Sequence, residues 1–164
     1  MRYVQRDQAG NVIAFYEREN PGVAEEALPD NHPDILKFLL GADKARKKIE
    51  IRNRFMRALE DGMAYGGKRL QIREEDQLNI TAMGNEARWA KATGAPWPAN
   101  FAWRMADDTY LSLPTADFCI ELGLAAKSRV LDLRQNKWRL DDLVRAATTK
   151  AALDAIDIDS GWPA

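Results

Sequence analysis

Two short segments with the same pattern constrain this chain more than any other feature of its sequence. LQIREED runs from Leu70 to Asp76, and LSLPTAD runs from Leu111 to Asp117, 41 positions later. In each segment, two large aliphatic residues stand two positions apart, a spacing that puts both side chains on one face of a β-strand. Each segment ends in an aspartate, which is favourable in the first turn of a helix because of the helix dipole. The pattern therefore predicts two strand-to-helix junctions.

Each junction is the centre of a predicted hairpin-plus-helix unit of about 40 residues. The first hairpin is expected to turn at Gly66-Gly67 in MAYGGKRLQI, and the second near residues 106–108 in FAWRMADDTYLSL. A helix from about Glu74 follows the first hairpin, and a long helix capped by Thr115 follows the second. The predicted fold class is α+β, with a small antiparallel sheet from two strand-strand-helix units packed on helices. The two hairpins are expected to join one four-stranded sheet.

The first part of the chain has a different pattern. Alternating apolar residues flank DQAGN, which predicts an N-terminal β-hairpin within residues 1–18. A loop containing several prolines follows at 19–33, and Asp30 or Asn31 is expected to cap a short helix after it. A lone hairpin is marginally stable in water, so this one is expected to pack on another element.

Glycines suggest where the domains divide. Gly41 is predicted to break or bend the short helix, and Gly62 to end the strong helix that follows it. The expected organisation is an N-terminal hairpin with a short helix over residues 1–40, serving as a leader or interaction module. A compact α+β domain with two hairpin–helix units is expected over residues 42–164.

The long helix after Thr115 carries apolar residues on two faces. A helix with two apolar stripes is expected to be covered on two sides. The first stripe comprises Cys119, Leu122, Ala126, Leu133 and Leu140, and the second comprises Ile120, Leu124, Leu131 and Trp138.

The totals exclude several classes of protein. Lys+Arg 24 against Asp+Glu 25 gives a net charge of −1, so the chain as a whole has no attraction for nucleic acid or an anionic membrane. No apolar run approaches the roughly 18 residues of a membrane-spanning helix. The start, MRYVQRDQAG, lacks the apolar core of a signal peptide. We expect a soluble, reduced, intracellular protein.

The residues that could carry chemistry all have a structural interpretation. His32, the only histidine, lies at a helix entry and is expected to serve the loop or cap the helix. Cys119, the only cysteine, lies on an apolar helix face and is expected to be a small buried side chain. YGGK at 65–68 lacks the Ser or Thr and the following helix of a phosphate loop, so it is expected to be a hairpin turn. No catalytic, cofactor-binding or metal-binding residue is predicted, and no cofactor.

Basic and aromatic residues provide candidate contacts. Residues 43–57 contain seven basic residues against two acidic ones, but they lack the interleaved aromatics of a nucleic-acid site. This helix is expected to be a solvated face or a patch for an acidic partner. The tail aspartates Asp154, Asp157 and Asp159, of the same chain or of a second subunit, are candidates for that partner. Tryptophan is favoured in cores and as an interface anchor. The candidate partner contacts are Phe15, Tyr16, Trp97, Trp103, Tyr110 and Trp162.

Several longer segments match a known pattern. They are YGGKRLQIREEDQLNI, FAWRMADDTYLSLPTADF, AATTKAALDAI and a terminal tryptophan. Through them, residues 65–162 resemble an uncharacterised domain family encoded in tail-fibre modules of tailed phages and prophages. The N-terminal MRYVQRDQAGNVIAFYER and LPDNHPDILKFL resemble the leader of phage tail assembly chaperone-like proteins. The chain departs from the family at Arg73, where Asp is frequent, and at Pro114, where Thr or Ser is frequent.

The resemblance implies a non-enzymatic protein that aids tail-fibre assembly or associates with the fibre. Its implied partner is a phage tail-fibre protein, with no nucleic acid and no membrane, and a homo-oligomer is left open. Its implied location is the host bacterial cytoplasm or the virion. One alternative is a structural tail subunit of the virion. The other, ranked behind both, is an enzyme acting on host glycan or peptidoglycan, which needs a pair of carboxylates that no spacing here selects.

Overall fold

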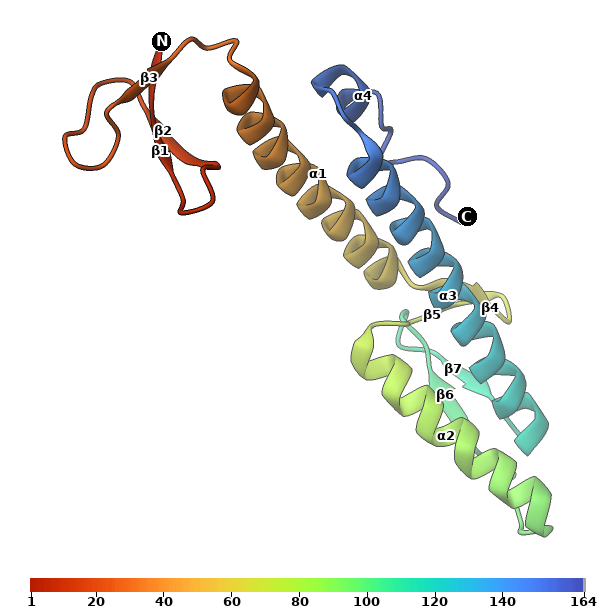
Figure 1. Cartoon of the computed structure of the whole chain (residues 1–164). Coiled ribbons are helices and arrows are strands. Elements are labelled where there is room, and N and C mark those ends of the chain that lie inside the picture. Colours follow the sequence, from red (N-terminus) through yellow and green to blue (C-terminus); the bar gives the residue numbers. More distant parts are fainter. Residues whose placement is uncertain (164) are drawn as a thin grey trace. The chain divides into compact units, whose positions relative to one another are not determined.

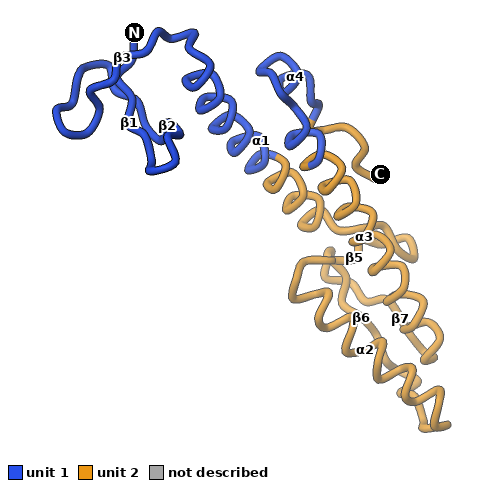
Figure 2. Tube along the Cα trace, in the orientation of Figure 1, with its two compact units in different colours: residues 1–50, 142–157 blue, residues 51–141, 158–164 orange. Residues whose placement is uncertain are grey.

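The computed structural model describes residues 1–163 and divides them into two compact units (Figure 2). Unit 1 comprises residues 1–50 and 142–157. Unit 2 comprises residues 51–141 and the chain from Ile158 onward. The elements are helices and small antiparallel sheets, which confirms the α+β class.

Unit 1 contains a three-stranded antiparallel sheet in the order β2-β1-β3 (Figure 1). Strands β1 (Arg2–Arg6) and β2 (Val12–Tyr16) form the predicted hairpin. Strand β3 (Glu26–Leu28) comes from the segment expected to be a loop, and it pairs with β1 through the register Arg2↔Leu28. A small core of Val4, Leu28 and Ile35 joins the sheet to the first helix, as a marginal hairpin requires.

A single guanidinium group ties this sheet together. Arg6 Nε and Nη2 donate to the Glu26 carboxylate at 2.6 and 2.9 Å. Arg6 Nη1 donates to Asp34 Oδ2 at 2.9 Å and to the Gly10 carbonyl oxygen at 2.7 Å. The hydrogen bonds to Glu26 and then to Asp34 raise the pKa of Arg6 above its ordinary value, and the bond from Arg6 lowers the pKa of Glu26. Arg6 thus connects β1, β3, the hairpin turn and the start of the helix.

Helix α1 (Pro33–Asp61) is longer than predicted. His32 Nδ1 accepts the Asp34 N–H at 3.2 Å, so the capping role expected of His32 is confirmed. The cap expected from Asp30 or Asn31 is wrong, since the Asp30 carboxylate binds elsewhere, accepting from Arg2 Nε at 3.0 Å. Gly41 lies inside α1, so the expected break is absent and the domain boundary predicted there falls within a helix.

Unit 2 contains both predicted hairpins, the first of the two predicted helices and most of the second. Strands β4 (Met63–Tyr65) and β5 (Lys68–Leu70) precede helix α2 (Glu74–Thr93). Strands β6 (Ala102–Arg104) and β7 (Tyr110–Ser112) precede the long helix α3. The remaining elements of the chain are α3 (Ala116–Ala146) and the short α4 (Lys150–Asp154).

The expectation that the two hairpins join one sheet is wrong. They form two separate two-stranded sheets, β4-β5 and β6-β7. The Ala106 N–H donates to the Arg69 carbonyl oxygen at 2.9 Å, an isolated backbone bond between the hairpins in place of a ladder. Each strand has only three residues, so neither hairpin is stable alone, and both depend on packing against the helices.

The two strand-to-helix junctions are confirmed. Leu70, Ile72 and Leu113 are fully buried in the core of unit 2, and Leu111 packs against that core. Asp76 lies in the first turn of α2, where its Oδ2 accepts the Arg73 N–H at 2.9 Å. The second aspartate likewise lies in the first turn of α3. The Thr115 hydroxyl caps that helix by accepting the Phe118 N–H at 3.4 Å.

Gly62 provides a test of the turn that ends α1. Its φ is +71°, and a Cβ built there would lie 2.3 Å from the Leu70 carbonyl oxygen. Gly62→Ala is therefore expected to destabilise the protein by more than about 1 kcal/mol. Gly41→Ala is the matched control, because Gly41 lies in a helix with nothing within 4 Å of an added Cβ. It is expected to stabilise by about 0.5–1 kcal/mol. Urea unfolding followed by circular dichroism measures both; shifts in the same direction would contradict the assignment.

Acid is expected to loosen the sheet of unit 1. Because the folded pKa of Glu26 lies below its ordinary value, its contribution is present above the ordinary glutamate pKa of about 4.3. It is lost as the pH falls through the lowered pKa. The amide NMR signals of β1 and β3 should therefore shift together below about pH 4. In Arg6→Met this shared transition should disappear; the same transition in wild type and variant would contradict the role given to Arg6.

Candidate functional site

The residues with reactive side chains serve packing. Cys119 is fully buried, and burial raises the pKa of its thiol to about 11, which confirms the expected small buried side chain. Within residues 1–163, no group of three or more His, Cys, Asp or Glu is placed to hold a metal ion. Across the same residues, no helix has the length and apolar character needed to cross a membrane.

The basic stretch of α1 finds partners within the chain. In unit 2, Arg54 Nε lies 3.1 Å from Asp159 Oδ1, and the Arg54 guanidinium lies 5.3 Å from the centre of the Trp162 ring. An acidic tail residue is therefore a partner in the same chain, as expected for Asp159. Asp154 instead pairs with Lys150, four residues earlier in α4. The basic stretch is partly a structural surface.

Three of the predicted contact residues are anchored in unit 2. Trp97 Nε1 donates to the Leu113 carbonyl oxygen at 3.0 Å, and its ring packs edge-on against Phe101 at 5.4 Å. Trp162 Nε1 donates to the Ile158 carbonyl oxygen at 2.8 Å. Trp97, Trp103 and Trp162 all pack against the core while remaining partly exposed. Their role in binding a partner stays a prediction.

The other three predicted contacts lie on strands. Tyr110, on β7, is 65% exposed and offers a free ring. Phe15 and Tyr16 lie on β2 and are half-buried. The Phe15 ring packs edge-on against Phe38 at 5.6 Å, and the Tyr16 hydroxyl donates to Gln5 Oε1 at 3.3 Å. The structure thus distributes the six candidates over both units, with Phe15 and Tyr16 in unit 1 and the other four in unit 2.

Helix α3 has cover on one side only. Its first apolar stripe is buried as expected. In its second stripe, Ile120 is partly buried against the core, whereas Leu124, Leu131 and Trp138 are 51%, 43% and 54% exposed. The expected cover of the second side is therefore wrong for these three residues within this chain. These three residues, which we call the α3 stripe, stand seven positions apart and so lie along one line of the helix.

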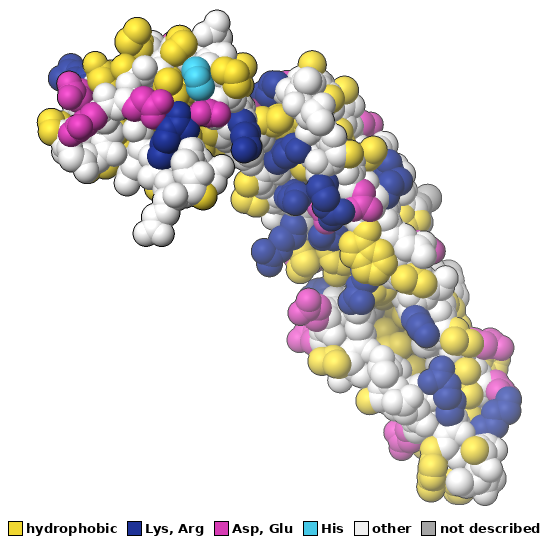
Figure 3. Space-filling view, in the orientation of Figure 1, with side chains coloured by type: hydrophobic (Ala, Val, Ile, Leu, Met, Phe, Trp, Pro, Cys, Tyr) yellow, Lys and Arg dark blue, Asp and Glu magenta, His cyan; other side chains and the backbone are white. Residues whose placement is uncertain are grey.

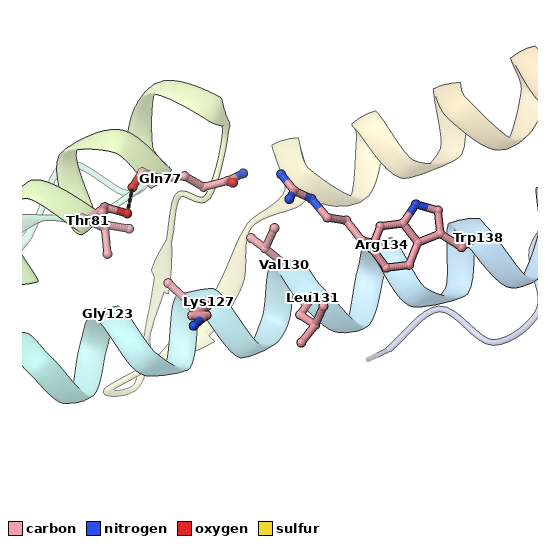
Figure 4. Close-up of a pocket in the computed structure, with 10 residues that line it drawn as sticks. Gln77, Thr81, Gly123, Lys127, Val130, Leu131, Arg134 and Trp138 are labelled. Carbon is pink, nitrogen blue, oxygen red and sulfur yellow. Dashed lines mark hydrogen bonds between the residues drawn. The ribbon is translucent and has the colours of Figure 1, made fainter.

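A groove runs beside the α3 stripe between α2 and α3 (Figure 4). Its volume of about 230 Å³ is below the range usual for small-molecule sites. Gly123 brings the helices close, since a Cβ there would lie 3.8 Å from Ile80 Cγ2. Figure 4 shows the side chains of Gln77 and Arg134 directed toward one another across the groove. The lining residues are Gln77, Ile80, Thr81, Gly123, Ala126, Lys127, Val130, Leu131, Arg134 and Trp138.

The chemistry of the groove suits binding. Its walls are largely apolar, and its charged groups are the cations Lys127 and Arg134. Figure 3 shows hydrophobic side chains exposed beside Lys and Arg side chains on the surface of unit 2. A groove of this kind fits an apolar ridge that carries negative charge. The sequence revealed the second stripe but gave no sign that it would be left open.

The sheet of unit 1 offers a second surface. Because the strand order is β2-β1-β3, strands β2 and β3 are both edges. An edge strand presents unpaired N–H and C=O groups that can pair with another chain. β2 is the longer edge, with five residues against three, and Ile13 on it is 48% exposed. This strand also carries Phe15 and Tyr16.

Comparison with known proteins adds the family. Residues 42–157 match the family described as Domain of unknown function (DUF4376). The chain belongs to this family. The DUF4376 region contains both junctions, the groove and the α3 stripe, whereas the sheet of unit 1 precedes it. No curated protein and no solved structure matches the chain.

The burial of Cys119 predicts its reactivity. A thiol reacts as the thiolate, so a buried thiol with a raised pKa should react with Ellman's reagent only as the protein unfolds. Ser112→Cys, at an exposed position of β7, provides the matched control. The variant is expected to show one rapidly reacting thiol and one that waits for urea. Equal rates for both thiols in the native protein would contradict the burial of Cys119.

Proposed function

We propose that this DUF4376 protein binds an unassembled phage or prophage tail-fibre protein and assists its assembly, in the host bacterial cytoplasm. Two features support the proposal. Residues 65–162 resemble an uncharacterised domain family encoded in phage tail-fibre modules, and the N-terminal segment resembles the leader of phage tail assembly chaperone-like proteins. The observation that carries the proposal is the open edge strand β2, because it lies within that leader segment.

The edge strand suits a partner that is itself unpaired. An unassembled fibre exposes strand edges that would otherwise aggregate. An extended segment of the fibre can add to β2 as a further strand, with main-chain hydrogen bonds supplying affinity. Ile13, Phe15 and Tyr16 supply apolar contact from the same strand. Main-chain pairing of this kind does not depend on a specific partner sequence. This suits a chaperone, which must cover different exposed edges.

The sheet is held ready for this contact. Arg6 fixes β1 to β3 and to the start of α1 through four hydrogen bonds to Glu26, Asp34 and Gly10. Arg2 lies over the Phe15 ring, with its guanidinium 4.1 Å from the ring centre. A strand that is already ordered loses less conformational entropy when a partner binds. The fixed edge therefore supports binding by β2.

Co-expression with a tail-fibre protein of the same phage or prophage tests the proposal. The wild-type chain is expected to form a complex with the fibre and to increase its solubility. Ile13→Lys places a charge on the edge strand and should weaken the complex by about tenfold or more, since edge lysines block strand addition. Ile49→Lys is the matched control, because Ile49 is a 60% exposed residue of α1.

The outcomes separate the function from its mechanism. The absence of both a complex and a change in fibre solubility would overturn the proposed function. Equal binding by wild type and Ile13→Lys would overturn the role of β2. Mass spectrometry of purified particles then distinguishes two kinds of fibre partner: stoichiometric presence indicates a structural virion subunit, and absence indicates an assembly protein that leaves.

A further inference from the structure

The outer face of α2 exposes apolar side chains, as the groove does, but the charges beside them have the opposite sign. Leu78 and Trp89 are 73% and 62% exposed. They stand eleven positions apart, which is close to three helical turns, and the exposed Ala82 lies between them on the same face. We call these three residues the α2 ridge. The exposed Asn85 stands on the same line between Ala82 and Trp89, so the ridge is mainly apolar with one polar residue. No other described element of unit 2 covers this face of α2.

Negative charge flanks the α2 ridge. Glu74, Glu75 and Glu86 are exposed, and none has an ion-pair partner within residues 1–163. Of the cations of the same helix, Lys91 pairs with Asp117, whereas Arg88 donates only to the neutral Asn85 Oδ1 at 3.3 Å and keeps its charge beside Trp89. Three glutamates against this one arginine still leave the exposed charge along the ridge negative.

Positive charge flanks the α3 stripe. Lys127 and Arg134 stand seven positions apart on the groove side of the stripe, and both are exposed. Neither has an ion-pair partner among the described residues. The groove and the α2 ridge are therefore complementary. The groove is apolar with positive flanks, and the ridge is mainly apolar with negative flanks.

We propose that two copies of this chain pair through these surfaces, with the α2 ridge of each copy seated in the groove and on the α3 stripe of the other. The glutamates beside each ridge then face Lys127 and Arg134 of the second copy. Because each copy contributes both surfaces, a two-fold arrangement uses each surface once and closes. The pair is a symmetric dimer built on four helices.

A second copy fits better than a free apolar surface on a monomer. Soluble monomers rarely expose large contiguous apolar patches. Here five large apolar side chains are exposed on two neighbouring helices: Leu78, Trp89, Leu124, Leu131 and Trp138. Pairing through them removes all five from water. The spacing of seven in the α3 stripe is the spacing by which helices pair along a seam.

The pairing does not depend on the proposed function. It uses unit 2, whereas the fibre-binding edge belongs to unit 1, and it is measured on this chain alone. A dimer would carry two copies of the β2 edge. Failure of the dimer leaves fibre binding untouched, and failure of fibre binding leaves the dimer untouched.

Charge reversal tests the pairing on the full-length chain. Size-exclusion chromatography with light scattering at about 1–100 µM should give twice the chain mass of 18.5 kDa for the wild type. The basic reversal, K127E/R134E, and the acidic reversal, E74K/E75K/E86K, should each weaken the dimer by at least about tenfold, because like charges then meet. Mixing the two variants should restore a dimer, since each interface then has opposite charges again.

The control variant reverses charge outside the pairing surfaces. R52E/R57E changes two exposed residues of α1 in unit 2 and should remain dimeric. Circular dichroism confirms that every variant is folded. A monomeric wild type at about 100 µM overturns the proposal. So does a dimer that resists both reversals, a mixture that fails to restore it, or an assembly larger than two.

Discussion

The short hairpins of unit 2 constrain everything else in that unit. Each has strands of three residues, too few to be stable in water by themselves. Their stability comes from Leu70, Ile72 and Leu113, which leave the strands and enter the core among the helices. The strand-to-helix junctions therefore stabilise the hairpins, as pairing into one continuous sheet would in a larger β-sheet. Because the helices supply that cover with their inner faces, their outer faces are left free.

Unit 1 solves the same problem with charge. The buried core between its sheet and α1 consists of Val4, Leu28 and Ile35, which is a small core for three strands. Single exposed ion pairs stabilise proteins little. Arg6 differs because one planar guanidinium serves two carboxylates and a carbonyl oxygen, so its geometry is fixed from several sides. The edge strand β2 stays ordered although no described strand pairs with its outer side.

The sequence predicts what residues impose locally and misses what distant packing decides. Gly62, Gly66 and Gly67 adopt the positive φ that few other residues tolerate, so turns were predictable. The prediction that Gly41 breaks the helix was wrong, because one glycine costs only about 1 kcal/mol and a long helix with packed residues on either side tolerates it. The three residues of β3 have no alternating pattern that predicts a strand. They form one because they pair with β1. The groove could not be predicted from the sequence, because it forms only where α2 and α3 pack side by side.

The second apolar stripe of α3 is the clearest disagreement between sequence and monomer. Its periodicity indicates a covered helix face, yet Leu124, Leu131 and Trp138 remain open to solvent. Such local conflicts concentrate at functional surfaces, because a residue chosen for an assembly is out of place in the free chain. Apolar periodicity indicates that a helix face is covered in the functional state of the protein. It does not indicate which molecule covers that face. Under the proposed pairing, the α2 ridge of a second copy supplies the missing cover, and the two stripes describe the assembled protein.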